Sequence, residues 1–161
     1  MKKITDFPYI SSRANPKITE AAKLADKKYR DASGCFAFEG IKLLSDACRS
    51  GYIPEAVYIT ERAYGRFYDE LDALGIDSAI TVVADAVYEK LSFENAPQGV
   101  FAVARQKRER SNAGDDGFVL FLDNVGDPGN LGAIIRTADA FGVCGQGVVG
   151  RDGENDGTLI A

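Results

Sequence analysis

The sequence predicts an α/β protein, with a small N-terminal α/β sandwich followed by the first part of a second α/β domain. Four runs with strand character alternate with helical patterns within the first hundred residues. A polar stretch follows at residues 106–117, and another strand–loop–helix pattern comes after it. The 161 residues suffice for one ordinary domain or two small ones, and 45% hydrophobic with 27% charged residues is typical of a globular protein.

The first predicted helix covers residues 17–30. The dipeptide Asn15-Pro16 before it is a helix-entry signal, because proline suits the first helical position, and Gly34 ends the pattern. Helical spacing places these apolar residues on one face: Ile18, Ala22, Ala25 and Tyr29.

Local composition predicts the other elements of the N-terminal domain. β-branched and aromatic residues indicate strands, apolar faces at helical spacing indicate helices, and Gly40 and Gly51 mark turns. The predicted strands are residues 35–38, 56–60, 80–83 and 99–104, and the predicted helices are residues 41–49, 61–74 and 85–91. We expect residues 1–105 to form one domain and the polar residues 106–117 to form a linker.

Residues 118–161 are predicted to begin a second domain. The apolar residues 119–122 suit a buried strand, and the glycine- and proline-containing residues 123–129 suit a turn. Asn130 is the expected cap of a helix that stops at Gly142, and residues 143–149 form a further short strand. A βαβ fragment of about forty-five residues is too small to close a parallel sheet unaided, so this domain is expected to be incomplete.

The charges are distributed unevenly along the chain. The net charge is −5 and the pI is near 4.8, yet the first 30 residues carry eight Lys/Arg and only three Asp/Glu. A basic end on an acidic protein is compatible with binding RNA, whose phosphates dominate affinity. The alternative is a helix face whose charges are simply solvated.

Histidine is absent, and the three cysteines, Cys35, Cys48 and Cys144, are isolated without metal-ligand spacing. The sequence therefore argues against a metal site and against histidine acid–base chemistry. The cysteines are expected to fill apolar space in a reducing cytosol. No apolar run is long enough to span a membrane and no secretory signal is recognisable, so a cytoplasmic location without a membrane partner is expected.

Two interpretations of the loop at residues 123–129 remain open. A helix N-terminus after a strand suits an anion, because free N–H groups and the helix dipole point outward. The loop matches neither the P-loop nor the Gly-x-Gly-x-x-Gly pattern of nucleotide-binding proteins, and its residues serve a tight connection equally well. Arg136 in the following helix either reaches back to the strand ends or lies at the surface beside Asp139.

Two separate regions carry a family resemblance. Asn130-Leu-Gly-Ala-Ile-Ile-Arg136-Thr-Ala, preceded by Asp127-Pro128-Gly129, resembles the first motif of the SpoU (TrmH-like) RNA 2′-O-ribose methyltransferases. Ser12-Arg13-Ala-Asn15-Pro16, then Lys28-Tyr-Arg30, then Phe38-Glu39-Gly40 resemble the RNA substrate-binding domain of one branch of that family. The similarity covers about residues 10 to 142, with both regions in the expected order.

The resemblance implies a SPOUT-type, normally knotted α/β domain that transfers a methyl group from S-adenosylmethionine to a ribose 2′-hydroxyl of RNA. It implies a role for Arg136 in activating the hydroxyl, with Asn130 orienting Arg136 or bonding the ribose. Because arginine is a cation in proteins, we expect Arg136 to stabilise the developing oxyanion and to hold an adjacent phosphate. The implied active-site loop consists of Asp127, Pro128, Gly129 and Gly132. The implied RNA-binding residues are Arg13, Asn15, Lys27, Lys28 and Arg30, although Asn15 and Glu39 also suit a role in fixing turns.

The chain departs from the family pattern after Gly142. The glycine/glutamate and serine/asparagine motifs, which form most of the methyl-donor pocket and the dimer interface in the family, are not matched. We therefore expect a fragment that is inactive alone and has no assigned donor-binding residue, with a homodimer only for a full-length protein. Ribosomal RNA is the expected substrate class. The alternative is a non-catalytic RNA-binding module in which residues 1–105 form a ribosomal-protein-like α/β sandwich.

Overall fold

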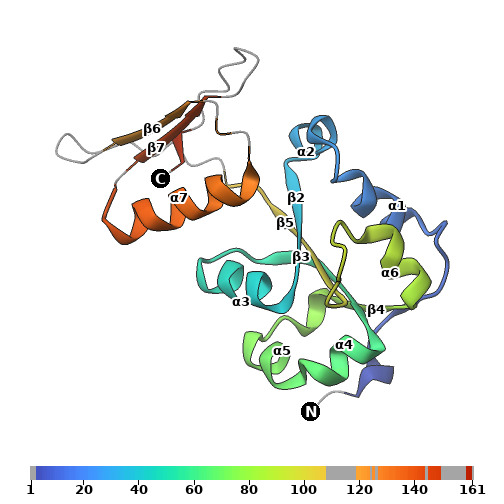
Figure 1. Ribbon diagram of the computed structural model, residues 1–161. Helices are drawn as coiled ribbons and strands as arrows, with labels where there is room; N and C mark the ends of the chain where they lie inside the picture. Colours follow the sequence, from blue (N-terminus) through green and yellow to red (C-terminus); the bar gives the residue numbers. More distant parts are fainter. Residues whose placement is uncertain are drawn as a thin grey trace. The chain divides into compact units, whose positions relative to one another are not determined.

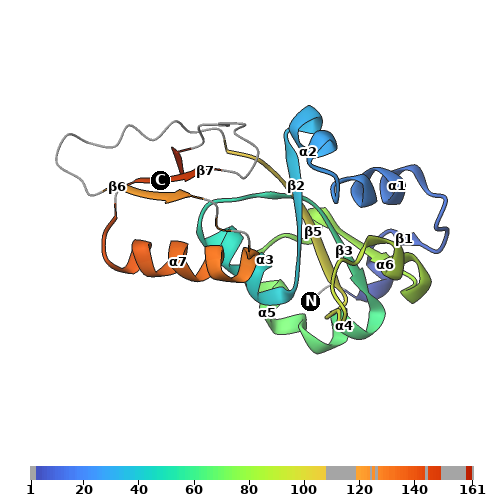
Figure 2. The ribbon, with the colours of Figure 1, turned by 45° about the horizontal axis from the view of Figure 1, so that its top comes forward.

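The computed structural model describes residues 3–107, 119–123, 125, 127–143, 145–149 and 159–160. The chain divides into two compact units, Met1–Gln106 and Lys107–Ala161. Figures 1 and 2 show the ribbon in two views. No helix in the described part of the chain is long and apolar enough to cross a membrane.

The first unit is built on a five-stranded sheet with the strand order β1-β4-β3-β5-β2. β1, β4 and β3 are parallel, whereas β5 pairs antiparallel with both β3 and β2. The loops that follow β1, β2, β3 and β4 therefore lie at one end of the sheet. The strands are β1 (Tyr9–Ile10), β2 (Cys35–Glu39), β3 (Pro54–Thr60), β4 (Ile80–Val83) and β5 (Val100–Arg105).

Helices cover both faces of this sheet (Figure 1). α1 and α6 pack on one face, while α3, α4 and α5 pack on the other. α2 connects α1 to β2. The helices are α1 (Pro16–Lys23), α2 (Lys27–Ser33), α3 (Ile41–Arg49), α4 (Glu61–Arg66), α5 (Tyr68–Leu74) and α6 (Asp85–Leu91), with short 3-10 helices at Ile4–Asp6 and Asp77–Ala79.

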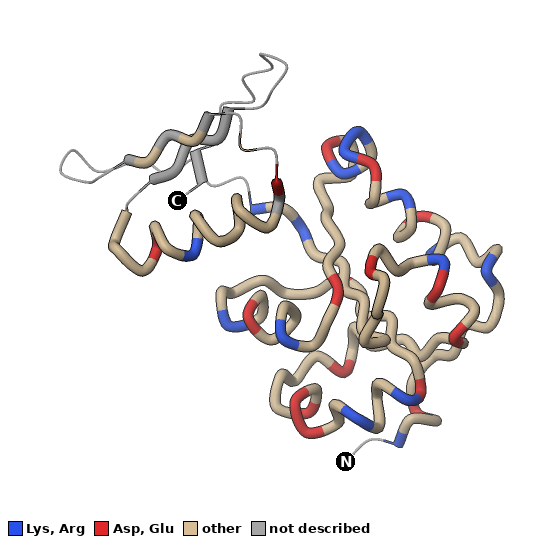
Figure 3. Tube along the Cα trace, viewed as in Figure 1, with Lys and Arg blue, Asp and Glu red and all other residues tan. Residues whose placement is uncertain are grey.

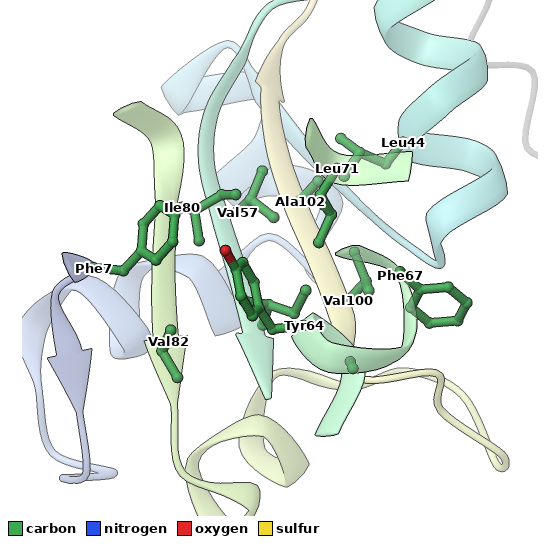
Figure 4. Packing of buried hydrophobic residues seen from close by; sticks show 12 residues of the cluster. Phe7, Leu44, Val57, Tyr64, Phe67, Leu71, Ile80, Val82, Val100 and Ala102 are labelled. Carbon is green, nitrogen blue, oxygen red and sulfur yellow. The ribbon is translucent and has the colours of Figure 1, made fainter. Parts of the chain in front are cut away.

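The alternation of side chains along the central strands creates two hydrophobic cores. In β3, Val57 and Ile59 belong to the core under α3, α4 and α5, whereas Tyr58 belongs to the core under α1 and α6. Figure 4 shows the first core, in which Leu44 and Leu71 come from helices and Val57 comes from the sheet. The sheet is thus the middle layer of a three-layer sandwich, in agreement with the predicted α/β class.

The prediction of one continuous helix over residues 17–30 is wrong. α1 and α2 are separated by a turn in which the amides of Leu24, Ala25 and Asp26 bond carbonyls three residues back. Asp26 Oδ1 then accepts the amide of Lys28 at 2.8 Å and starts α2, because an aspartate side chain competes for backbone N–H groups. The fully buried residues of α1 and its cap are Ile18, Ala21 and Leu24. Of the other predicted residues, Ala22 and Tyr29 are partly buried against the same core, whereas Ala25 is exposed.

The predicted helix over residues 61–74 is also divided. α4 and α5 meet at Phe67, whose φ of −114° and ψ of 25° interrupt the helix. The Phe67 ring is buried in the first core. Packing of this side chain therefore overrides the helical pattern, while most of the other predicted boundaries hold to within two residues.

The second unit contains β6 (Val119–Asp123), α7 (Pro128–Ala140), β7 (Gly145–Val149) and β8 (Leu159–Ile160). β6 and β7 are parallel neighbours, so α7 is the crossover between them. β8, which the sequence does not predict, pairs antiparallel with β7. α7 ends near the predicted stop, with Gly142 at a φ of +70°. The predicted linker is described only at Gln106 and Lys107, and its other residues lie outside the described ranges.

Candidate nucleic-acid interface and candidate active-site loop

The candidate active-site loop connects β6 to α7. Asp127 is the N-cap of α7, since its Oδ1 accepts the amide of Asn130 at 2.7 Å and its carbonyl accepts the amide of Leu131 at 3.0 Å. The prediction of Asn130 as the cap is therefore wrong. The Asp127-Pro128 pair starts the helix earlier, because aspartate is a good cap and proline suits the first helical position.

This cap favours one of the two interpretations of the loop. The carboxylate of Asp127 already occupies the N-terminus of α7, and a bound anion would meet its negative charge. A Cβ added at Gly129 would lie 3.1 Å from Asp127 Oδ1, so the glycine leaves room for the capping carboxylate. The described start of α7 thus suits a tight connection better than a phosphate cradle.

The guanidinium of Arg136 lies over the preceding turn of α7. A Cβ added at Gly132 would lie 3.3 Å from Arg136 Nη1, as expected for side chains four residues apart on one helix. Arg136 is exposed, and between described residues it forms neither an ion pair with Asp139 nor a hydrogen bond with Asn130. The structure therefore brings Arg136 to Gly132 and leaves Asn130 on a different side of the helix.

The candidate RNA-binding residues Arg13 and Asn15 follow β1. Asn15 Oδ1 accepts the amide of Lys17 at 2.9 Å and caps α1, which confirms its expected role in fixing a turn. Ser12 Oγ accepts the amide of Ala14 at 3.2 Å, and the Ser12 carbonyl accepts the amide of Asn15 at 3.2 Å. These bonds form a tight turn that leaves the side chain of Arg13 exposed.

The candidate residues in α2 differ in their contacts. Lys27 lies 3.9 Å from Asp31, and both side chains are more than half exposed, so this ion pair contributes little to stability. Arg30 Nη1 donates to the carbonyls of Leu24 and Ala25 at 2.9 Å and 2.7 Å. Arg30 therefore stabilises the turn between α1 and α2, a role that its charge alone does not predict.

The structure separates the candidate RNA-binding residues into two groups. Arg13 and Asn15 lie at the end of the sheet where β1 finishes, whereas the candidates in α2 lie beside the start of β2, at the opposite end. α1, which is about 12 Å long, spans the distance between them and exposes Lys17 and Lys23. Figure 3 shows basic positions along both helices, so the basic region is an elongated strip rather than one cluster.

Glu39 fixes a turn, as predicted. Its carboxylate accepts hydrogen bonds from the Tyr88 hydroxyl at 3.1 Å, from the Ser92 hydroxyl at 2.9 Å and from the amide of Phe93. Burial, and then the charge of Glu39, raise the pKa of Tyr88 well above its ordinary value, so its hydroxyl stays protonated and donates. These bonds join the end of α6 to the end of β2.

The described cysteines have no nucleophilic or metal-binding environment. Cys35 Sγ lies 3.5 Å from Glu55 Oε2, and burial followed by the charge of Glu55 raises the pKa of this thiol. Burial also raises the pKa of Cys48. Thiols with raised pKa values are poor nucleophiles. Among the described residues, no group of three side chains suits a metal ion.

Comparison with known proteins places this chain among RNA methyltransferases. A sequence profile described as the MRM3-like substrate binding domain matches residues 15–102, more than half of the chain. The 23S rRNA (guanosine(2553)-2'-O)-methyltransferase RlmP of Bacillus subtilis is 32% identical over 147 residues, which cover 91% of this chain and 56% of that protein. The 23S rRNA (uridine(2479)-2'-O)-methyltransferase of Streptomyces viridochromogenes is 29% identical, covering 81% and 47%. The chain thus spans about half the length of these relatives.

Solved structures have the same fold over most of this chain. A crystal structure of an RNA 2'-O ribose methyltransferase has a TM-score of 0.69 and 33% identity, covering 88% of this chain and 55% of that one. An AdoMet-bound rRNA methyltransferase from Sinorhizobium meliloti has a TM-score of 0.68 and 30% identity, covering 90% and 55%. The profile matches the N-terminal domain, and the relatives and solved structures are similar to most of the chain. Both findings agree with the motifs around Arg13 and Arg136. The chain therefore belongs to the SpoU (TrmH-like) RNA 2′-O-ribose methyltransferase family, in the branch that carries an MRM3-like substrate binding domain.

Proposed function

We propose that this sequence provides the RNA-recognition domain and the opening of the catalytic site of an rRNA 2′-O-ribose methyltransferase that uses S-adenosylmethionine. One observation carries the proposal: the matched substrate binding domain at residues 15–102 is followed, in the same chain, by an Asp127-capped helix that presents Arg136. The chain spans about half the length of its relatives, so the complete activity, the ribosomal RNA substrate and a homodimer all belong to the proposal.

The proposed role of Arg136 follows from the chemistry of the substrate. A ribose 2′-hydroxyl is a poor nucleophile, and its oxygen gains negative charge as the proton leaves. S-adenosylmethionine, when bound, supplies the electrophilic methyl group. As a cation, Arg136 stabilises this oxygen and holds a neighbouring phosphate. Its exposure and the absence of a side chain at Gly132 leave the guanidinium accessible for this role.

The other loop residues have supporting roles in this proposal. Asp127 fixes the start of α7, which begins with Pro128 and Gly129, and this loop would shape the catalytic site. Asn130 bonds the ribose, since no hydrogen bond between described residues joins it to Arg136. No described residue is assigned to S-adenosylmethionine.

In the N-terminal domain, we assign RNA phosphates to Arg13, Lys27 and Lys28, whose side chains are exposed. Asn15 and Arg30 act mainly by holding the backbone that presents these residues, because their polar atoms already bond the ends of α1. RNA binding by these residues is expected to be salt-dependent.

The catalytic assignment is tested by Arg136→Ala in a protein that joins this sequence to the segments completing the catalytic domain in its relatives. Loss of one preorganised charge donor should lower the rate of methyl transfer by about a hundredfold or more. RNA affinity should change by no more than about twofold, because most phosphate contacts lie in the first unit. Arg49→Ala, at an exposed position in α3, is the matched control. Methyl transfer that survives in the Arg136 variant would remove the catalytic role from this residue.

A second candidate function is a non-catalytic RNA-binding module. It is favoured by the construction of the first unit, which has its own sheet and two cores. This candidate predicts RNA binding without methyl transfer in the same completed protein, irrespective of Arg136. Transfer of a labelled methyl group to RNA by the unsubstituted protein would exclude it.

A further inference from the structure

Lys90, in the last turn of α6, contacts the candidate RNA-binding turn from far along the sequence. Its ammonium Nζ donates to the backbone carbonyl of Arg13 at 2.7 Å and to the hydroxyl of Thr19 at 3.0 Å. Arg13 lies in the exposed turn after β1, and Thr19 lies in α1. The Lys90 side chain therefore joins α6 to α1 and to the turn after β1, in addition to the contacts of the core under α1 and α6.

The bond to the Arg13 carbonyl constrains the backbone of the turn. The turn's own hydrogen bonds, from Ala14 and Asn15 to Ser12, close it locally but do not attach it to the rest of the unit. The Arg13 carbonyl would otherwise face solvent, and a bond from a charged donor is stronger than one between neutral groups. Lys90 thus fixes the point from which the exposed side chain of Arg13 extends.

The partners of Lys90 are neutral, so its charge is retained. Neither a carbonyl nor a hydroxyl cancels the ammonium charge, and no ion pair between described residues involves Lys90. Lys90 is a partly buried residue, and its anchoring bonds place no carboxylate beside Arg13. The anchor therefore brings no negative charge that would repel a phosphate at the Arg13 side chain, and the fixed backbone is the contribution of Lys90 to binding.

We propose that Lys90 is a positioning residue for RNA binding, which acts by anchoring the backbone of Arg13 so that its guanidinium is preorganised for an RNA phosphate. The inference rests on the proposed function, in which Arg13 contacts RNA. It assigns an RNA-binding role to a residue of α6, outside the basic segment that the sequence indicates.

The binding experiment is a double-mutant cycle on the 161-residue chain. Affinity for a ribosomal RNA fragment is measured at several salt concentrations for the unsubstituted chain, Lys90→Met, Arg13→Ala and the double variant. Each single substitution should weaken binding by about three- to tenfold near 0.1 M salt, and the double variant should be no weaker than the weaker single variant. Lys90→Arg, which retains a charged donor, should restore most of the affinity. Lys42→Met, on the opposite face of the sheet, is the matched control.

Hydrogen exchange provides a readout that does not depend on RNA. The amides of Ala14 and Asn15 should exchange at least severalfold faster in Lys90→Met than in the unsubstituted chain, while amides of the central strand β3 remain protected. Unchanged exchange in the turn would overturn the inference even if RNA affinity fell. Multiplicative losses in the double variant would also overturn it, since they would show that Lys90 acts independently of Arg13. If the unsubstituted chain bound no RNA and the turn still exchanged faster in Lys90→Met, the proposed function would be contradicted. The anchoring of the Arg13 backbone by Lys90 would still hold.

Discussion

Gly132 and Arg136 illustrate how one residue without a side chain can determine the accessibility of another. They lie four residues apart in α7, and Arg136 Nη1 occupies space within 3.3 Å of the position that a Cβ at residue 132 would take. This relation can be read from the sequence, because residues four apart share a helix face. The cap cannot be assigned in the same way, since Asp127 and Asn130 are both good N-cap residues.

Gly132→Ala is expected to separate stability from activity. Alanine should stabilise α7 by about 0.5–1 kcal/mol relative to glycine, because glycine has greater freedom in the unfolded chain. The added Cβ should displace the Arg136 guanidinium and slow methyl transfer severalfold in the completed protein. Urea unfolding and single-turnover methylation measure the two effects.

Ala133→Ser, at the exposed neighbouring position, is the control for a small change on the surface of α7. It should leave the methylation rate within about twofold, since residue 133 faces a different direction on the helix. An unchanged rate in Gly132→Ala would show that the position of the guanidinium over this turn is not required.

At the scale of secondary structure, one carboxylate joins the end of α6 to the end of β2, beside the core that these elements share. Glu39 accepts bonds from Tyr88, Ser92 and Phe93, all of which lie in or just after α6. No local pattern indicates this arrangement, because Glu39 and Tyr88 are 49 residues apart. The sequence places both elements correctly, yet only their packing shows that the turn after β2 and the loop after α6 form one network.

This network predicts a pH dependence of stability. The pKa of Tyr88 is raised in the folded protein from an ordinary value of about 10. Its contribution to stability is therefore complete below pH 10 and declines as the pH rises further, because the unfolded chain then loses the proton more readily. Tyr88→Phe should cost about 1 kcal/mol at neutral pH and should reduce the decline in unfolding free energy between about pH 9.5 and 11.

Urea unfolding across this pH range measures the effect, with Tyr9→Phe at an exposed position as the control. Other buried tyrosines, such as Tyr58, also have raised pKa values. Part of the decline in unfolding free energy is therefore expected to remain in Tyr88→Phe. An identical slope in Tyr88→Phe and the unsubstituted chain would mean that Tyr88 does not contribute to it.

At the scale of the whole molecule, the basic strip spans the first unit from the end of β1 to the start of β2. The sequence reveals the excess of Lys and Arg in the first 30 residues but does not assign a role to each. The structure shows that Arg30 holds a turn, whereas Lys27 and Lys28 are exposed and Lys27 forms an exposed ion pair with Asp31. The contribution of these charges to RNA binding is therefore best tested by substituting Lys27 and Lys28 and keeping Arg30.

The double variant Lys27→Gln/Lys28→Gln is expected to weaken RNA binding and flatten its salt dependence. Each lost phosphate contact should reduce the slope of log K against log salt by about 0.7–0.9. Lys42→Gln/Arg49→Gln, on the opposite face, removes the same charge and controls for the net charge of the chain. Equal slopes in the unsubstituted chain and the α2 variant would identify Lys27 and Lys28 as a solvated helix face.

Local signals in the sequence predict the order of most strands and helices, because alternation, helical spacing and glycine positions depend only on neighbouring residues. The two motifs around Arg13 and Arg136 also identified the family, since a motif depends on residue types at fixed short spacing. Burial of Phe67 in the first core accounts for the break between α4 and α5, whereas the break before α2 follows from the local cap at Asp26, which outweighs the apolar periodicity. Tertiary structure also decided which polar residues meet. Lys90 and Arg13 are 77 residues apart, and only packing of α6 beside α1 brings a charged donor to that carbonyl.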